Sequence, residues 1–551
     1  MRAKNILLSR LEEIVAELKL DWPEKVQIEP PKDKKFGDLA INIAMTLSRQ
    51  SGLPPRETAS ILARRLQEKE PALANVEIAG PGFLNLTYAD AFWQDTVRII
   101  LESGGDYGKS DVGRGRKTQV EFVSANPTGP LHIGHGRGAA IGDTLARLLR
   151  FAGYDVQTEY YINDAGKQMR LLGLSVRLRV LELAGRPVDW PKDWYKGAYI
   201  KDLAAEMLKN WPDLPDRPEA EALDFCFEYA QDRIMQGIKK DLADFRVAHD
   251  RWFSERTLVA DGSVDKTFAR LKQSGHIFEH EGALWFKTAT MGDDLDRVLR
   301  KSDGYLTYFA SDIAYHANKY DRGFDLVVDV WGADHHGYIP RMRAAIASLG
   351  RAQEDFEVVL VQLVNLLDNG KQIAMSTRQG QFETLADVLT EVGTDAARFM
   401  FLSRKSDSPL NFDLNLVKQR TLDNPVYYVQ YAHARIHAIL RRAAEKNIKL
   451  AKDNSGEFSG YLVEGRELSL LRKADDFPEV VASAAMNLAP HHISFYLMEL
   501  ARELHAYYAS VQVLNARDAN MAAARLDLLR AVAHVLKNGL ELLGVNAPEN
   551  M

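Results

Sequence analysis

The segment S-A-N-P-T-G-P-L-H-I-G-H, at residues 124–135, decides the fold class of this 551-residue chain. An alternating segment typical of a strand precedes it at 120–123, and an Ala-, Leu- and Arg-rich segment that predicts a helix follows at 136–150. A strand, a Pro/Gly-rich turn and a helix in this order are typical of a phosphate-binding parallel sheet. Because a helix N-terminus carries unpaired N–H groups and partial positive charge, we expect His132 and His135 to add donors for the same phosphate oxygen.

The wider context makes this motif more specific. Two histidines flanking a glycine are weak evidence alone, because a surface turn can carry the same letters. The longer stretch 124–143, together with E-Y-Y-I-N-D-A-G at 159–166, resembles class I aminoacyl-tRNA synthetases with their HIGH motif, and bacterial-type arginyl-tRNA synthetases in particular. The resemblance implies an arginine–tRNA ligase that activates L-arginine with ATP, transfers it to the 3′ end of tRNA(Arg), and releases AMP and pyrophosphate.

The same resemblance implies a set of ligands and roles. ATP with Mg²⁺ would be a substrate complex, and no tightly bound cofactor is expected. His132 and His135 would be catalytic donors to the α-phosphate, and Gly134 would contact ATP with them. Members of this family typically require bound tRNA before they activate arginine.

Length and composition fit a multidomain enzyme. A chain of 551 residues is too long for one core and predicts three or four domains. Its single cysteine, Cys226, excludes an internal disulfide framework and a cysteine zinc cluster, and its apolar helical surroundings predict a buried, inert thiol. No apolar stretch approaches the roughly 20 residues of a membrane span, and the N-terminus lacks a signal-peptide pattern. We therefore expect a cytoplasmic protein without a membrane partner.

Three regions separate by pattern. Residues 1–113 predict a small α+β domain, with an amphipathic helix near 7–18, F-G-D-L-A-I-N-I-A at 36–44, and a strand–turn–strand at 76–86. Residues 114–420 alternate strands and helices, as in a parallel sheet, which the resemblance makes a Rossmann-like catalytic domain.

Two insertions and a helical ending complete the expected organisation. A polar, helical insertion lies near 170–245, and a hairpin turning at Glu281–Gly282 lies near 275–300. Residues 421–551 predict an all-α bundle. By resemblance, the N-terminal domain meets the outer corner of tRNA, and the bundle, opening with N-P-V-Y-Y-V-Q-Y-A-H-A-R-I, binds the anticodon.

The arginine site is expected around G-Y-L-T-Y-F-A-S-D-I-A-Y at 304–315. Tyr308 and Asp312 are four residues apart and share a face if this segment is helical, although an ordinary helix surface shows the same spacing. A guanidinium is a planar group that carboxylates bind through paired hydrogen bonds. By resemblance, Asp312 and Glu255 would hold the guanidinium, Tyr308 would pack on it or bond to it, and Ser124 and Asn126 would hold the backbone groups of the amino acid.

A nucleotide contact is expected in W-G-A-D-H-H-G at 331–337, which follows an apolar strand. Its Gly332-x-Asp334 spacing is similar to the element with which class I synthetases approach the ATP ribose. A metal held by Asp334, His335 and His336 is the alternative, but adjacent histidines in a strand point to opposite faces. We therefore expect Asp334 and His335 to contact ATP, and we assign no metal site.

The second signature of the class departs from its usual form here. The segment I-A-M-S-T-R-Q-G at 373–380 is similar to the KMSKS loop that clamps the β- and γ-phosphates, but Ala374 and Thr377 replace its lysines. Some family members that lack the second lysine carry one just before the HIGH motif, where this chain has Gly129. The source of positive charge for the phosphates is therefore open.

Residues around the altered loop supply the candidates. We expect Met375 to contact ATP and Ser376 and Arg378 to act in catalysis, with Arg378 providing cationic charge and Mg²⁺ covering part of it. Lys371 is the weaker candidate. The alternative is that residues 373–380 form a polar loop with no role in catalysis.

Contacts to tRNA are expected from basic residues near each end of the chain. Lys34 and Lys35 lie near the N-terminus, and Tyr431 and Arg435 lie on the first C-terminal helix. Each could equally belong to a solvated face, and the net charge of −6 does not decide the matter. We expect a monomer.

Two other functions remain open on sequence. A cysteinyl-tRNA synthetase would share the C-terminal helical domain, but it would need a thiol-selecting zinc site that one cysteine argues against. A non-catalytic regulator that binds tRNA or arginine would explain the missing lysines, but the intact residues His132, His135, Tyr308 and Asp312 argue against that loss of activity.

Overall fold

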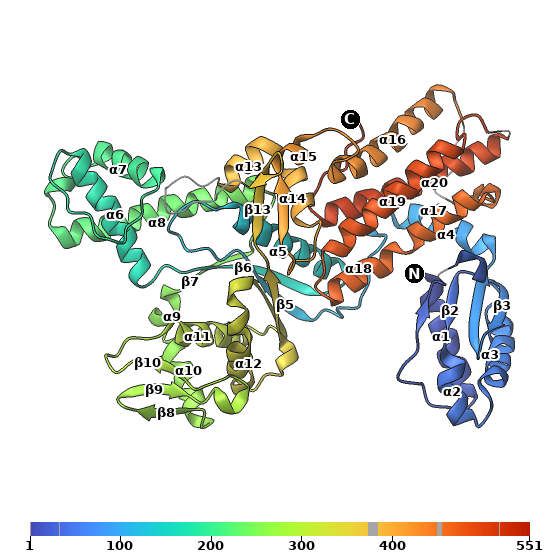
Figure 1. Cartoon of the computed structure of the whole chain (residues 1–551), viewed down its shortest axis with the longest axis horizontal. Coiled ribbons are helices and arrows are strands. Elements are labelled where there is room, and N and C mark those ends of the chain that lie inside the picture. Colours follow the sequence, from blue (N-terminus) through green and yellow to red (C-terminus); the bar gives the residue numbers. More distant parts are fainter. Residues whose placement is uncertain (1, 32, 373–383, 449–454, 517) are drawn as a thin grey trace.

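The computed structural model describes the whole chain except residues 1, 32, 373–383, 449–454 and 517. In Figure 1 a parallel sheet lies at the centre of an elongated molecule. A helical arm extends to one side of the sheet, and a helical bundle with a small N-terminal domain lies on the other. The predicted fold class, a multidomain protein with a Rossmann-like parallel-sheet domain between a small α+β domain and a helical bundle, is confirmed.

The N-terminal domain is the expected α+β unit. Its four-stranded antiparallel sheet has the order β1-β2-β4-β3. The F-G-D motif lets the chain pass close to β4 at the start of β2. Gly37 has φ of +100°, and a Cβ there would lie 2.5 Å from the Leu86 carbonyl oxygen. Asp38 then accepts a hydrogen bond from the Tyr88 backbone N–H at 2.9 Å. The elements are α1 (Arg2–Glu17), β1 (Ile28–Glu29), β2 (Leu39–Ile41), α2 (Ile43–Ser51), α3 (Pro55–Lys69), β3 (Leu73–Ala79) and β4 (Phe83–Tyr88).

Helix α4 (Asp90–Ser103) joins this domain to the C-terminal helices. It packs against α17 (Gly465–Asp475) and α20 (Ala519–Leu542), and Gln94 donates to the Leu462 carbonyl at 3.0 Å. The contact brings segments from opposite ends of the sequence together (Figure 1). The boundary near residue 113 stays a prediction.

The central domain is built on a five-stranded parallel sheet with the order β12-β11-β5-β6-β7. From β5 the chain proceeds through β6 to β7 on one side, and β11 and β12 lie on the other side. In such sheets, ligands bind at the carboxyl ends of the strands where the order reverses, here between β5 and β11. The elements are β5 (Lys117–Glu121), α5 (Ile133–Phe151), β6 (Asp155–Ile162), β7 (Arg251–Ser254), α9 (Arg256–Ala260), α10 (Ser263–Gln273), α11 (Tyr308–Asp321), β11 (Leu326–Gly332), α12 (Ile339–Ser348) and β12 (Phe356–Val361).

Both expected insertions are present. The first is the helical arm between β6 and β7, formed by α6 (Lys167–Leu183), α7 (Ala198–Asn210) and α8 (Glu219–Asp244). The second contains the hairpin of β8 (Ile277–His280) and β9 (Ala283–Phe286), whose turn residues Glu281 and Gly282 have φ of +50° and +74°. A third strand, β10 (Arg297–Arg300), pairs with β9 and was not predicted, because its short charged sequence lacks a strand pattern.

Two further sequence predictions concern the cysteine and membrane spans. Cys226 on α8 is buried, and burial raises the pKa of its thiol to about 12, in line with an inert side chain. No helix in the described part of the chain is long and apolar enough to cross a membrane.

The remaining elements form a linking subdomain and the predicted helical bundle. The linking elements are β13 (Val364–Asp368), β14 (Lys371–Gln372), α13 (Leu385–Val392), α14 (Thr394–Phe401), β15 (Leu410–Asp413) and α15 (Leu414–Lys418). The bundle consists of α16 (Pro425–Glu445), α17, α18 (Phe477–Met486), α19 (His491–Ser510) and α20.

Candidate active site

The two histidines of the H-I-G-H motif cap the start of α5. His132 is the N-cap residue, and its Nδ1 accepts hydrogen bonds from the backbone N–H groups of Gly134 at 3.1 Å and His135 at 3.4 Å. The Nδ1 of His135 accepts in return from the His132 N–H at 3.3 Å. These bonds start the helix at Ile133, three residues before the predicted start, because the imidazoles satisfy N–H groups that would otherwise lack partners.

These contacts determine which nitrogen of each imidazole ring carries the proton. A neutral imidazole whose Nδ1 accepts carries its proton on Nε2, so each ring keeps an N–H for a ligand. Burial lowers the pKa of His132, and it lowers the pKa of His135 to about 3. The rings stack with centroids 3.7 Å apart, and a Cβ at Gly134 would lie 2.9 Å from the His132 ring. The site therefore presents two neutral donors at neutral pH.

The protonation of these rings can be measured directly. An ordinary histidine has a pKa near 6.5, and the burial of His135 depresses that value. We expect the His135 ring to remain neutral down to about pH 5. In histidine-labelled protein, NMR signals assigned with His132→Asn and His135→Asn should keep neutral-imidazole shifts over that range. The urea-unfolded chain gives the reference titration, and a His135 midpoint near 6.5 in the folded protein would contradict the assignment.

A cavity of about 630 Å³ opens beside the histidine pair. Asn126 lines it, as predicted for a residue that holds a ligand, and the Asn126 amide donates to Gln168 at 2.7 Å. Tyr199, from the helical arm, donates to the Thr128 carbonyl at 2.6 Å and so fixes the arm against the turn before α5. The arm therefore forms one wall of the site.

The predicted guanidinium ligands come from α11 and the end of β7. Tyr308 and Asp312 lie one turn apart on α11, as predicted, and the Tyr308 side chain is 64% exposed. Glu255 is buried and hydrogen-bonds to the Ser311 side chain, next to Asp312. The structure thus brings Glu255 and Asp312 to one place although they are far apart in sequence.

The charges at this place are not balanced within the described residues. Burial raises the pKa of Glu255, and the neighbouring carboxylates of Asp312 and Asp164 add to the rise. Burial likewise raises the pKa of Asp312, whose carboxylate accepts a hydrogen bond from the Tyr338 hydroxyl. Neither Glu255 nor Asp312 has an ion pair with a described lysine, arginine or histidine. Because buried carboxylates are costly without a cation, this site is suited to a cationic ligand.

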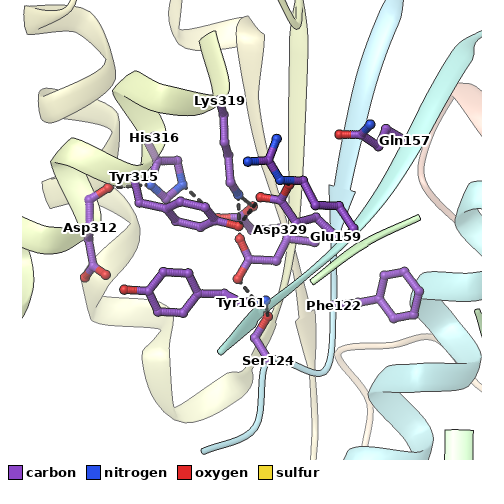
Figure 2. Close-up of polar contacts among 12 residues, drawn as sticks. Phe122, Ser124, Gln157, Glu159, Tyr161, Asp312, Tyr315, His316, Lys319 and Asp329 are labelled. Carbon is purple, nitrogen blue, oxygen red and sulfur yellow. Dashed lines mark hydrogen bonds and ion pairs between the residues drawn. The ribbon is translucent and has the colours of Figure 1, made fainter. Parts of the chain in front are cut away.

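Sequence reasoning missed several side chains around these carboxylates. Tyr338 follows the quoted 331–337 segment, and Tyr161 lies within the quoted E-Y-Y-I, but neither was assigned a role. In Figure 2, Tyr161 and Asp312 lie on the same side of a group of buried polar residues. The Tyr161 ring packs 4.5 Å from the Tyr315 ring, and burial raises its pKa. No local motif marks such residues, because separate strands and helices bring them together.

The candidate ribose contact lies at the carboxyl end of β11. Asp334 and His335 are in a 3-10 helix, Ala333–Tyr338, so the assumption of an extended strand at the two histidines was wrong. Their side chains are 82% and 63% exposed, with His335 Nε2 3.5 Å from Asp334 Oδ2. Within the described ranges, no group of three or more His, Cys, Asp and Glu side chains is arranged to hold a metal ion.

The altered phosphate loop falls mostly outside the described residues. Met375, Ser376 and Arg378 are among those not described. Lys371 is described and lies exposed in β14, just before that segment. The roles predicted for the loop stay predictions.

The candidate tRNA contacts lie in separate domains. The Arg435 guanidinium bonds to His505 Nδ1 at 3.1 Å, and it lies 4.8 Å from the Tyr431 ring and 4.5 Å from the Tyr508 ring. Lys35 is exposed and pairs with Asp33 at 3.0 Å. Lys34 begins the short 3-10 helix Lys34–Phe36. Arg435 and the tyrosines thus form a cation–aromatic cluster on α16 and α19.

Known protein families cover nearly the whole chain. The family described as tRNA synthetases class I (R), catalytic domain, matches residues 96–410. The arginyl tRNA synthetase N terminal domain matches residues 3–88, and the DALR anticodon binding domain matches 429–551. An arginine–tRNA ligase of Nitratidesulfovibrio vulgaris strain Miyazaki F is 66% identical over the full length of both chains. The chain belongs to the arginyl-tRNA synthetases.

Further relatives agree with this arginyl-tRNA synthetase family. The arginine–tRNA ligase of Lawsonia intracellularis is 53% identical over the full length of both chains. A putative arginyl-tRNA synthetase of Campylobacter jejuni has a TM-score of 0.77 and 37% identity, and the match covers 84% of this chain and all of that one. The Thermus thermophilus arginyl-tRNA synthetase has a TM-score of 0.75 at 24% identity, covering 99% and 100%; it shows the fold alone. As an arginine–tRNA ligase, this class I synthetase uses ATP to aminoacylate tRNA(Arg).

Proposed function

We propose that His132 and His135 are the donors that stabilise the α-phosphate of ATP while arginyl-adenylate forms. A carboxylate oxygen of arginine attacks the α-phosphorus, and the bond to the bridging oxygen breaks, so that pyrophosphate leaves with the electron pair. The observation that carries this role is that each Nδ1 accepts a backbone N–H, which leaves each Nε2–H free to donate. Neutral donors fixed in advance suit a transition state in which charge increases on phosphate oxygens.

We propose that Asp312 and Glu255 bind the guanidinium of the arginine substrate. Two carboxylates without a cationic partner among the described residues support this role, and the exposed Tyr308 one turn earlier is placed to cover the ligand. Asn126 in the cavity beside the histidines would hold the backbone end of arginine. The Ser124 hydroxyl donates to Glu121 and accepts from the Tyr161 N–H, so it retains one lone pair for a ligand.

ATP would enter as its Mg²⁺ complex between the carboxyl ends of β5 and β11. Gly134 lets the backbone approach the phosphates, Asp334 and His335 would contact the nucleotide, and Met375 would lie against it. We assign Ser376 and Arg378 to the leaving pyrophosphate, because its charge grows as the α–β bond breaks. The terminal 2′-hydroxyl of tRNA then attacks the arginyl carbonyl and AMP leaves.

We propose that the two outer domains hold the tRNA. Residues 1–113, with Lys34 and Lys35, would meet its outer corner, and residues 421–551, with Tyr431 and Arg435, would bind the anticodon. Stacking of bases on aromatic rings beside an arginine is a common mode of binding single-stranded RNA. We expect a monomer that acts in the cytoplasm, where its three substrates meet, and sedimentation of the purified protein tests the monomeric state.

Pyrophosphate exchange with each amino acid, with and without tRNA, tests the assignment of the site. We expect exchange with arginine only, and much faster exchange when tRNA(Arg) is present. Exchange with cysteine would favour the cysteinyl alternative. Binding of arginine or tRNA without any exchange would favour a non-catalytic regulator.

The anticodon assignment predicts the behaviour of Arg435→Ala. We expect tRNA(Arg) affinity to fall about tenfold, because the substitution removes both a phosphate-attracting charge and a stacking surface. Affinity measured by filter binding at two salt concentrations is the readout. Arg442→Ala, on an exposed position two turns later on α16, removes the same charge and is the matched control. Equal losses for both variants would mean that general charge, and not this cluster, binds the tRNA.

A further inference from the structure

A continuous set of polar contacts, with buried side chains at its centre, lies behind the arginine site and links its two ends (Figure 2). It starts in the turn after β5, crosses to α11 and β11, and returns to the turn of α11 that carries Asp312. Its central members, Glu121, Lys319, Asp329 and His316, have no role in the proposed reaction. In order, the members are Ser124, Glu121, Lys319, Asp329, His316 and Asp312.

Lys319 is the centre of this network. Its side chain is fully buried, and its ammonium donates to Glu121 Oε2 at 2.5 Å and Asp329 Oδ1 at 2.8 Å. Glu121 and Asp329 are direct neighbours across the parallel pairing of β5 and β11. Two like charges opposite each other on paired strands repel. Lys319 removes this repulsion and holds α11 against the two strands.

The charges of Lys319 and Asp329 support each other. Burial opposes the charge on Lys319, but Asp329 and Glu121 outweigh it and raise the pKa of the ammonium. Burial also opposes the charge on Asp329, but Lys319 and His316 outweigh it and hold the pKa of Asp329 at about 2. Both groups are therefore charged at neutral pH.

His316 extends the network to the guanidinium end of the site. Its Nδ1 lies 2.8 Å from the Asp312 carbonyl oxygen, and its Nε2 lies 2.9 Å from Asp329 Oδ2. The Asp312 carbonyl and the Asp329 carboxylate are both acceptors, so the ring bridges the backbone of α11 and the carboxylate on β11. The ring fixes the backbone of the residue whose side chain would bind the guanidinium.

Glu121 extends the network to the backbone end of the site. Its Oε1 accepts from the Ser124 hydroxyl at 2.8 Å, and that hydroxyl accepts from the Tyr161 N–H at 3.1 Å. Val123 and Ser124 have φ of +69° and +38°, a left-handed conformation that a β-branched residue such as valine rarely adopts. Such backbone strain persists only where surrounding contacts hold it. The strained residues end two positions before Asn126.

We propose that Lys319 is a positioning residue that fixes the distance between the Asn126 end and the Asp312 end of the arginine site, and that the enzyme thereby selects its substrate by chain length. The proposal rests on the proposed arginine site. Lys319 does not touch the substrate in this account. It acts by joining α11, which carries Asp312, to β5, which leads to Asn126, and to β11, which lies beside β5.

Selectivity among arginine homologues tests this role. Homoarginine has one methylene more than arginine, and 2-amino-4-guanidinobutyrate has one fewer. We expect the wild-type enzyme to prefer arginine over each by about 10- to 200-fold in kcat/KM, the range available for one methylene. In Lys319→Met and in the isosteric Glu121→Gln, we expect this preference to fall about fivefold or more, measured by pyrophosphate exchange with tRNA present.

The matched control is Arg398→Met. Arg398 is also fully buried and pairs with a buried carboxylate, Asp143, but it has no bond to this network. It should lose thermal stability and keep the wild-type preference. The proposal is overturned if folded Lys319→Met or Glu121→Gln loses activity equally towards all three amino acids, or if Arg398→Met relaxes the preference as much. If Lys319→Met does not fold, the preference of Glu121→Gln for arginine over its two homologues tests the proposal instead. A wrong assignment of the arginine site would give a different result from a wrong role for Lys319. The wild-type enzyme itself would then show no preference for arginine over its homologues.

Discussion

Asp312→Asn is expected to raise the KM for arginine more than a hundredfold while the KM for ATP changes little. The substitution replaces a charged acceptor by an amide and presents N–H donors to the donors of the guanidinium. Losing one partner of a desolvated, charge-assisted contact costs about 2–5 kcal/mol. Asn has nearly the same size as Asp, so it can still accept from the Tyr338 hydroxyl, and the fold should be preserved.

The control for this variant is on the same helix. Asp321→Asn removes a carboxylate whose side chain is 61% exposed and which pairs with Arg270 at the other end of α11. It should leave both KM values close to those of the wild type. Steady-state pyrophosphate exchange gives both constants. An unchanged KM for arginine in Asp312→Asn would remove this carboxylate from the site.

His132→Ala and His135→Ala are each expected to slow adenylate formation by a factor of about 10² to 10³. Removing one fixed donor to a developing oxyanion costs about 3 kcal/mol in other enzymes. Each ring also caps α5, so part of the loss can come from a shifted helix start. At the N-cap position of His132, asparagine separates the two effects, because it is a good N-cap residue but does not reproduce the imidazole Nε2–H.

Single-turnover rates measure this step without product release. We expect His132→Asn to regain the stability that His132→Ala loses, and to remain slow. His280→Ala, an exposed histidine in the hairpin between β8 and β9, should behave as the wild type. Wild-type rates in both His132 and His135 variants would reject the catalytic assignment.

The sequence predicts the parts of the site that local pattern controls. The strand, turn and helix around the H-I-G-H motif, the helical arm, the hairpin at Glu281–Gly282 and the C-terminal bundle all follow from periodicity and turn residues, and the structure confirms them. The start of α5 was three residues off, because helix propensity does not reveal that an imidazole can cap.

What the sequence does not predict depends on contacts across the fold. Nothing in the sequence relates Glu121 to Asp329 until the pairing of β5 and β11 sets them side by side. Lys319 then compensates both, although its position on α11 gives no local sign of burial. Tyr338 and Tyr161 likewise acquire their places beside Asp312 only when separate strands and helices meet.

The comparison of arginine with citrulline tests the central claim most directly. Citrulline has the same length and shape, but a neutral urea group replaces the guanidinium. If Asp312 and Glu255 form a cation site, the wild-type enzyme should prefer arginine by about 10⁴-fold in kcat/KM, because citrulline leaves both carboxylates unpaired. The measurement is pyrophosphate exchange with tRNA(Arg) and each pure amino acid. A preference below about tenfold would contradict the account, because the carboxylates would then not select the substrate.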